Sequence, residues 1–135
     1  MEESLYLSIK RDMMITKKLR KKLKKNSFKI NLLETTIFLI KDKDMFQSIY
    51  DDIEYNSNTN DVHGLCLSTV NEGIKDIYIG LFCNRDDVLV HECVHASLYM
   101  LSNIEENANE DSELQPFLVQ TLFRESKKVL KRISR

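Results

Sequence analysis

The sequence predicts one α+β domain spanning residues 1–135, built on a small sheet that is mixed or mostly antiparallel. Three observations support this fold class. Short β-branched apolar runs occur beside segments with the 3.6-residue period of helices. Two strand-like runs are joined by a short turn that contains glycine, the pattern of a β-hairpin. The 135 residues are 42% hydrophobic and 30% charged, as is usual for a folded soluble domain.

Two strands and two helices are predicted in the N-terminal half. Residues 4–9 alternate apolar with polar side chains, and residues 35–40 form a β-branched apolar run that suits a central strand. Residues 16–25 and 44–53 carry apolar side chains at every fourth position, so we expect a helix in each. The apolar stripe of the first helix consists of Ile15, Leu19 and Leu23, and that of the second of Met45, Ile49 and Ile53.

Positive charge is concentrated near the N-terminus, although the net charge of the chain is only −1. Half of the twenty lysines and arginines lie within residues 10–29. A basic amphipathic helix can lie on an anionic membrane, contact nucleic acid phosphates, or be a solvated helix docked by its apolar stripe. We expect the solvated helix and no membrane contact. Nucleic acid binding through Lys17 to Lys25 is kept as an alternative, although no aromatic residues are interleaved with the lysines.

A β-hairpin is predicted from residues 62–70 and 74–82, with Asn71, Glu72 and Gly73 as its turn. In the second arm, the alternation places Ile77, Ile79 and Leu81 on one face, and Asp76, Tyr78, Gly80 and Phe82 on the other. The polar residues 56–61 before the hairpin are interpreted as a surface loop within the domain.

The hairpin leads into a helix that we expect to run from Asn84 to about Ser102 and Asn103. Asn84 is the predicted N-cap, with Asp87 completing a capping box, and Asp86 and Asp87 suit the positive end of the helix dipole. The helix is apolar on nearly all sides, which is typical of a helix buried in the middle of a domain.

A last helix is predicted after the acidic residues 104–112. Ser112 and Gln115 match a capping box, and Pro116 is tolerated in a first turn. We expect the basic residues near its C-terminal end to be solvated. Its apolar side is predicted to consist of Leu114, Phe117, Leu118, Leu122, Val129 and Ile133.

The segment HECVH, inside this predicted helix, indicates a metal-binding and catalytic function. His91 and His95 are four residues apart, so they lie on one helix face and can present two imidazole nitrogens to one metal ion. Glu92 lies about 100° round the helix, where it can reach a water bound to that ion. This is the HExxH arrangement of zinc hydrolases, with two ligands and a general base in one turn. Ligand type favours zinc over other divalent ions without deciding the choice.

A catalytic zinc usually has three protein ligands, so a third is expected from the last helix. Glu113 is the predicted ligand because it begins that helix, 18 residues after His95, with Glu110 and Asp111 as alternatives. Two further arrangements are considered and set aside. His63 and Cys66 have an HxxC spacing, but a single histidine near a strand is more often structural. Cys83 and Cys93 could join the histidines in a closed structural site, but Cys93 points about 200° away from the His91 face.

The three cysteines, Cys66, Cys83 and Cys93, are odd in number and have no CxxC spacing, so we expect reduced thiols. The sequence shows no signal peptide and no apolar stretch of transmembrane length. These features together predict a cytoplasmic location.

The HECVH motif followed by Glu113-Leu114-Gln115-Pro116-Phe117-Leu118 resembles small zincin-like proteins of bacteriophages and prophages that are described as metallopeptidases. It also shares the gluzincin plan, HExxH with a downstream glutamate. The resemblance covers residues 62–125. It implies a zincin-like peptidase fold and a phage or mobile-element origin, with His91, His95 and Glu113 as zinc ligands. Pro116 and Phe117 replace the Ala and Tyr of the family pattern, and Ser97 is polar where zincins usually carry an apolar residue.

The expected function is therefore zinc-dependent hydrolysis of a peptide bond, with Glu92 as the general base that activates the zinc-bound water. Tyr78 and Tyr99 are candidate donors to the oxyanion, although each is also a candidate for packing in the core. The second hairpin arm could bind an extended peptide by strand addition if it lies at the sheet edge. A narrower alternative is a peptidase that cleaves one specific protein, such as a repressor of a mobile element. A different class of function is a zincin-fold protein with a structural or idle metal site that binds a partner protein.

Overall fold

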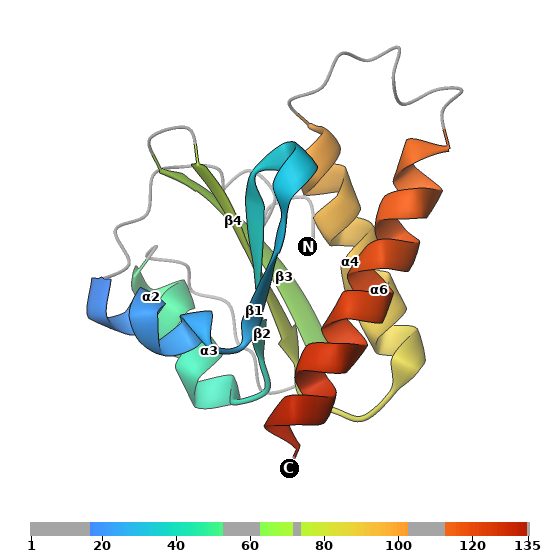
Figure 1. The fold of residues 1–135 in the computed structure, drawn as a ribbon. Helices are drawn as coiled ribbons and strands as arrows, with labels where there is room; N and C mark the ends of the chain where they lie inside the picture. Colours follow the sequence, from blue (N-terminus) through green and yellow to red (C-terminus); the bar gives the residue numbers. More distant parts are fainter. Residues whose placement is uncertain (1–16, 53–62, 72–73, 103–112, 135) are drawn as a thin grey trace.

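The computed structural model describes residues 17–52, 63–71, 74–102 and 113–134, and it has an α+β fold (Figure 1). The predicted strand at residues 4–9 and the polar loop at residues 56–61 lie outside the described residues. The described elements are four α-helices, one 3-10 helix and a four-stranded mixed sheet. In chain order they are α2 (Lys17–Lys24), β1 (Ser27–Ile30), η1 (Asn31–Leu33), β2 (Thr35–Ile40), α3 (Lys43–Asp52), β3 (Gly64–Asn71), β4 (Ile74–Leu81), α4 (Asp86–Leu101) and α6 (Leu114–Ile133).

The sheet has the strand order β1-β2-β4-β3. The predicted hairpin is confirmed, because β3 and β4 pair antiparallel, and β1 and β2 form a second antiparallel pair. The two pairs are joined by the parallel pairing of β2 with β4, from Thr35 opposite Lys75 to Ile40 opposite Gly80. β4 therefore lies between two strands and has no free edge. Strand addition to the second hairpin arm was expected only if that arm lay at the sheet edge, and β4 does not meet this condition. β3, the first arm, lies at the edge of this sheet instead.

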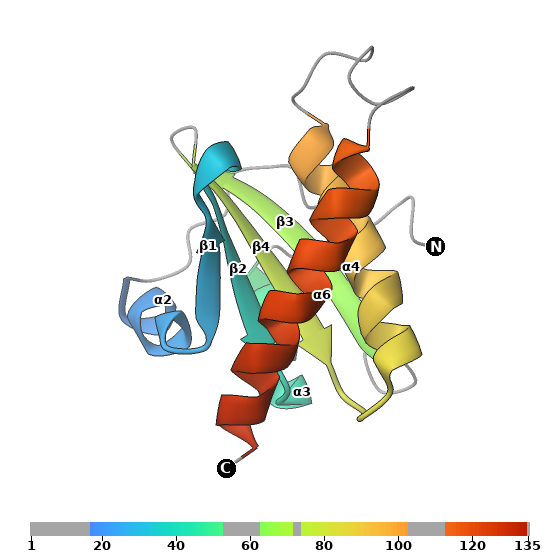
Figure 2. The same ribbon diagram turned by 45° about the vertical axis from the view of Figure 1, so that its right-hand side comes forward.

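Helices cover both faces of the sheet, so the molecule has three layers (Figures 1 and 2). α2 and α3 lie on one face, and α4 and α6 lie on the other. The two central strands are therefore buried on both sides, which explains why residues 35–40 form a continuous apolar run rather than an alternating pattern. The predicted alternation of β4 is confirmed: Ile77, Ile79 and Leu81 pack towards α4 and α6, and Tyr78 packs on the opposite face.

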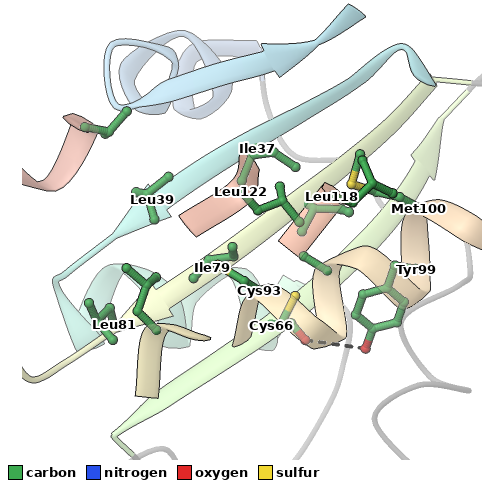
Figure 3. Close-up of a cluster of buried hydrophobic side chains, with 14 of the residues drawn as sticks. Ile37, Leu39, Cys66, Ile79, Leu81, Cys93, Tyr99, Met100, Leu118 and Leu122 are labelled. Atoms are coloured by element: carbon green, nitrogen blue, oxygen red, sulfur yellow. Dashed lines mark hydrogen bonds between the residues drawn. The ribbon is translucent and has the colours of Figure 1, made fainter. Parts of the chain in front are cut away.

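The core on the α4 and α6 face is the larger of the two hydrophobic clusters (Figure 3). Leu89, Cys93 and Ala96 project from α4 at a spacing of three or four residues, so they form one stripe against the sheet. Leu118, Leu122 and Val129 are buried from α6, as predicted. Phe117 was expected in the same row, but 57% of its surface is exposed. Phe117 lies about one helical turn after Leu114, which packs against the core, but its own side chain lies outside the buried stripe of α6.

The opposite face is covered by α3 and by the basic helix α2. Leu23 of the predicted apolar stripe is 3% exposed and packs with Phe38 and Tyr78. The Arg20 guanidinium donates to both carboxylate oxygens of Asp76 in β4, at 3.1 and 3.2 Å. This contact raises the pKa of Arg20 above its ordinary value. The helix is therefore docked by its stripe and one ion pair, and its exposed lysines face solvent; these are Lys18, Lys21, Lys22 and Lys24.

The two predicted helix caps are wrong. α4 begins one residue later than expected, with Arg85 as its N-cap, and the Asn84 side-chain oxygen instead accepts a hydrogen bond from the Lys41 ammonium at 2.8 Å. Asp86 and Asp87 do lie in the first turn, as predicted. The N-cap of α6 is Glu113, which makes no side-chain cap hydrogen bond. Ser112 of the predicted capping box lies outside the described residues.

The C-terminal end of α4 is fixed by a buried lysine from the sheet. Lys75 of β4 is almost fully buried, and its ammonium donates to the carbonyl oxygen of Tyr99 and to the hydroxyl of Ser102. A cation at this position complements the negative end of the helix dipole. Ser102 is the C-cap of α4, close to the predicted helix end. Among the described helices, none combines the length and the apolar character needed to cross a membrane.

Candidate metal-binding and catalytic site

The first two predicted metal ligands lie side by side on α4. The Nε2 atoms of His91 and His95 are 3.2 Å apart, and their ring centroids are 4.8 Å apart with an angle of 78° between the ring planes. The helix produces this arrangement because residues four apart are stacked on one face. His91 is exposed and His95 is half-buried, so the nitrogen pair is reachable from solvent.

The distance between the two nitrogens fits a zinc ion. A zinc–nitrogen bond of 2.0–2.1 Å and a tetrahedral angle place two ligand nitrogens about 3.3 Å apart. The observed 3.2 Å is within 0.2 Å of this separation. The same distance also suits a hydrogen bond between two neutral imidazoles of suitable tautomers. Zinc ligation and a direct hydrogen bond both need the two Nε2 atoms to face each other. In zinc ligation, the ion would lie between the two nitrogens and bind both.

Glu92 lies on the inner side of the histidine pair. Its side chain is buried, with 5% of its surface exposed, between α4 and the edge strand β3. A Cβ atom built on Gly64 would lie 3.2 Å from Glu92 Oε2, 3.1 Å from Glu92 Cγ and 2.8 Å from Val88 Cγ1. The absence of a side chain at Gly64 therefore provides the space that Glu92 occupies. Figure 2 shows β3 running alongside α4.

The sequence motif did not reveal Gly64 as part of this site. The available signal was a glycine inside the predicted strand of residues 62–70, which often marks a close approach of another group to the backbone. The residue that approaches Gly64, however, lies 28 positions later in the chain. Sequence spacing alone could not connect the two.

α4 is not buried on all sides, contrary to the prediction from its apolar composition. Val90 is 39% exposed and Leu98 is 41% exposed, and both lie on the same solvent-facing side as His91. The physical reason is the position of α4 in an outer layer, where the sheet and α6 cover only part of its surface. The histidines are therefore accessible, and a metal is not needed to satisfy buried imidazoles.

The predicted third ligand, Glu113, lies at the start of α6 and is exposed. The side-chain amide of Gln115 donates to the hydroxyl of Ser97 at 3.3 Å, so the first turn of α6 is held against α4 two residues beyond His95. Within residues 17–52, 63–71, 74–102 and 113–134, no three His, Cys, Asp or Glu side chains form a metal-binding group. Glu113 therefore stays a prediction as the third ligand. The alternatives Glu110 and Asp111 lie outside the described residues.

The other metal-binding candidates are separated by the fold. His63 is exposed just before β3, whereas Cys66 is buried against α4. Cys93 is buried beside Ser126 of α6 and faces away from the histidines, as predicted. Burial raises the pKa of the Cys93 thiol to about 12 and raises that of Cys66 well above its ordinary value. All three cysteines are free. Because the thiolate is the form that binds a metal, the raised pKa values make Cys66 and Cys93 poor metal ligands.

The two tyrosines that were candidates for the oxyanion site are core residues. Tyr78 stacks on Phe38 with ring centroids 5.0 Å apart on the α2 and α3 face. Burial raises its pKa, with the neighbouring Asp76 as a second cause. Tyr99 is buried, and its hydroxyl donates to the carbonyl oxygen of Cys66 at 3.5 Å (Figure 3). Both tyrosine side chains are therefore packed in the core, and neither hydroxyl is directed into the histidine site.

An apolar groove lies beside the histidine pair, between α4 and α6. Its volume is about 550 Å³, and it is open to solvent. Val90 and Val94, which form its α4 side, directly precede His91 and His95 in the sequence. The α6 side consists of Gln115, Pro116, Val119, Gln120 and Phe123. The groove could hold an apolar side chain of a bound peptide or protein next to the candidate metal site.

Comparisons with known proteins identify no relative of this chain. No family model, no curated protein and no solved structure matches it. The case for a function therefore depends on the geometry of the described residues and on the sequence motif.

Proposed function

We propose that the protein is a zinc-dependent metallopeptidase of the zincin type. In this proposal His91, His95 and Glu113 hold the zinc ion, as in gluzincins, and Glu92 is the general base. The observation that carries the proposal is the pair of Nε2 atoms 3.2 Å apart, with a buried carboxylate on the next residue. The resemblance to phage and prophage proteins, and the cytoplasmic location expected from free thiols, belong to the same proposal.

A zinc ion held by His91, His95 and Glu113 would lower the pKa of a water bound to it and would polarise a substrate carbonyl. The chain's own groups then account for proton transfer and positioning. Glu92 accepts a proton from the water and later donates it to the departing amine, which regenerates the carboxylate. The packing of Glu92 against Gly64 limits the positions that the carboxylate can take, so it is held beside the histidine pair.

The edge strand β3 supplies a surface for an extended substrate. Its outer edge can form main-chain hydrogen bonds with a peptide, because β3 has β4 as its partner in the sheet and no second strand on its other side among the described residues. β3 packs on α4, and Gly64 at its start contacts Glu92. A peptide bound along β3 would therefore pass close to the general base.

The test is metal content combined with peptide hydrolysis. Elemental analysis of purified wild-type protein should find about one zinc per chain, in agreement with the single histidine pair. His95→Ala and Glu113→Ala should lose or weaken this binding, and His63→Ala is the matched control because it removes a histidine outside the pair. Peptide libraries should then be cleaved by the zinc-loaded protein and not by Glu92→Gln, which should retain its zinc. If the purified protein contains no metal and its fold is unaffected by His95→Ala and Glu113→Ala, the proposed peptidase function is refuted.

A second candidate function is a partner-binding protein whose metal site is structural or idle. The specific observation in its favour is the apolar groove between α4 and α6, whose lining residue Val90 is 39% exposed, together with the exposed apolar side chains of Leu98 (41%) and Phe117 (57%) on the same two helices. Exposed apolar groups that gather in this way often mark a protein contact. Under this function Glu92→Gln leaves partner binding intact, while Val90→Asp together with Phe117→Asp abolishes it. Co-purification with and without these substitutions distinguishes the two functions.

A further inference from the structure

A second cavity lies at the opposite end of α4 from its C-terminal lysine contact. It has a volume of about 440 Å³ and is formed where β4, α4 and the last turns of α6 meet. Figure 1 shows the C-terminal end of α6 beside the N-terminal end of α4. We call this cavity the lysine pocket. It is lined by Lys41, Leu81, Asn84, Asp86, Lys127, Lys128, Leu130, Lys131 and Ser134.

The lysine pocket carries an excess of positive charge. Four ammonium groups line it, against the single carboxylate of Asp86. Lys127 pairs with Asp86 at 2.9 Å, and Lys128 pairs with Glu125 outside the lining at 3.0 Å. Two positive charges therefore remain in excess even when both carboxylates are counted. Like charges that converge on one cavity repel each other, and a bound anion would relieve that repulsion.

The uncharged residues of the lysine pocket position its donors and give it a defined shape. Lys41 is held by the side-chain oxygen of Asn84 at 2.8 Å, so its ammonium is positioned at the pocket without being neutralised by a carboxylate. Ser134 contributes a hydroxyl at the end of α6. Leu81 and Leu130 are both nearly fully buried and form an apolar floor. The pocket therefore combines separate donors with a defined shape, which scattered surface lysines do not provide.

We propose that the lysine pocket binds the phosphate groups of a multiply charged phosphate ester. Phosphate oxygens accept charge-assisted hydrogen bonds from several ammonium groups at once. The site does not depend on the proposed peptidase function. His91 lies five residues beyond Asp86 on α4, about 7.5 Å along the helix axis. The phosphate and metal sites are therefore distinct.

The phosphate can come from a small molecule or from a nucleic acid backbone. The Arg132 side chain donates to the carbonyl oxygen of Lys25 at 3.5 Å, so the last turn of α6 touches the end of the basic helix region. Positive charge thus continues from the lysine pocket towards the exposed lysines of α2. A small ester should use only the lysine pocket, whereas a nucleic acid strand should use the pocket and α2 together.

The test is calorimetric titration with inorganic triphosphate and, in a second arm, with a single-stranded oligonucleotide. Both arms use near-physiological salt and metal-free protein with EDTA, because phosphate also binds metal ions. The double variant Lys41→Gln/Lys131→Gln should weaken triphosphate binding about tenfold or more. Lys21→Gln/Lys22→Gln on α2 is the matched control, since it removes the same charge outside the lysine pocket.

Asp86→Asn provides a variant with the opposite expected sign. It removes the only carboxylate of the lining and releases Lys127, so affinity should rise about threefold. A gain cannot result from misfolding. Saturable triphosphate binding with these changes supports a small ester. Oligonucleotide binding at least tenfold tighter, with loss in both double variants, supports a nucleic acid backbone. Absence of saturable binding of either probe, or no difference between the pocket and control variants with triphosphate, would overturn the proposal.

Discussion

Replacing Gly64 with alanine tests whether this position provides the space that Glu92 occupies. The new methyl group would lie 2.8 Å from Val88 Cγ1, 3.1 Å from Glu92 Cγ and 3.2 Å from Glu92 Oε2. Carbon atoms normally approach to about 3.5–4.0 Å, so the nearest contact is short by about 0.7 Å. The backbone of Gly64 is not left-handed, and alanine therefore introduces no backbone strain.

The expected cost follows from these contacts. Forcing a methyl group into an occupied site usually costs about 1–3 kcal/mol. Replacing glycine at an unstrained position recovers about 0.4–1 kcal/mol through the unfolded chain. We therefore expect Gly64→Ala to lower the free energy of unfolding by about 1–2 kcal/mol. For a chain of this length, that corresponds to a fall in Tm of about 3–7 °C. The displaced Glu92 should also lower peptide hydrolysis without lowering zinc content.

Urea denaturation of a double-mutant cycle measures the effect. Val88→Ala removes the nearest atom, so Gly64→Ala should cost at least about 0.5 kcal/mol less in that background than in the wild type. Because the contacts with Glu92 remain, the recovery should be partial. A stabilising Gly64→Ala, or an equal cost in both backgrounds, would refute the close packing of Gly64 against α4.

Three further predictions concern metal, pH and the end of α4. Zinc at one hundred times its Kd should raise the free energy of unfolding of the wild type and of His63→Ala by about 2.7 kcal/mol. The same zinc concentration should not stabilise His95→Ala. Thermal denaturation with and without zinc measures the effect, and an equal gain in His95→Ala would place the metal elsewhere. Burial raises the pKa of Cys93 to about 12. An unfolded thiol titrates near about 8.5, so each of the buried thiols Cys66 and Cys93 should lower stability above that pH by up to about 1.4 kcal/mol per pH unit. The fall should be less steep in Cys93→Ala, which keeps Cys66, and identical urea midpoints from about pH 8 to 10.5 in wild type would contradict this. Lys75→Met removes the hydrogen bonds at the end of α4 and should cost about 1–3 kcal/mol, with faster amide exchange near Ser102; unchanged exchange would show that this contact does not fix the helix end.

Local patterns in the sequence predicted most of the elements. The central strand β2 occupies the predicted residues 35–40, and α3 begins one residue before its predicted start. The hairpin was also found, because two strand-like runs around a glycine turn are close in sequence. These features depend on contacts between near neighbours, which composition and periodicity describe well.

Long-range contacts were not predictable in the same way. The parallel pairing of β2 with β4 joins residues 40 positions apart, and no local signal identifies the partner. That pairing places β4 inside the sheet and leaves β3 at the edge. The predicted cap at Asn84 failed for a similar reason, because Lys41, 43 residues earlier, takes its side-chain oxygen. In both cases a distant partner determined the outcome.

The candidate site was predicted in part. The spacing of His91 and His95 fixes their relative position on any helix, so the sequence was sufficient for that pair. It was not sufficient for the exposure of α4, since apolar residues such as Val90 suit either a covered or an open face. The contact between Gly64 and Glu92 depends on how the hairpin packs on α4, which only the folded chain defines.

The position of α6 has a consequence for synthesis of the protein. α6 is the last described element, yet it packs on β1 and β2, which are translated well before it. The α2 and α3 layer can assemble on the sheet as soon as β4 has left the ribosome. The opposite apolar surface, which includes Ile37 and Leu39, stays open until translation of α6 is complete. During this interval one face of the sheet is covered by helices, while the other exposes apolar side chains to which chaperones can bind.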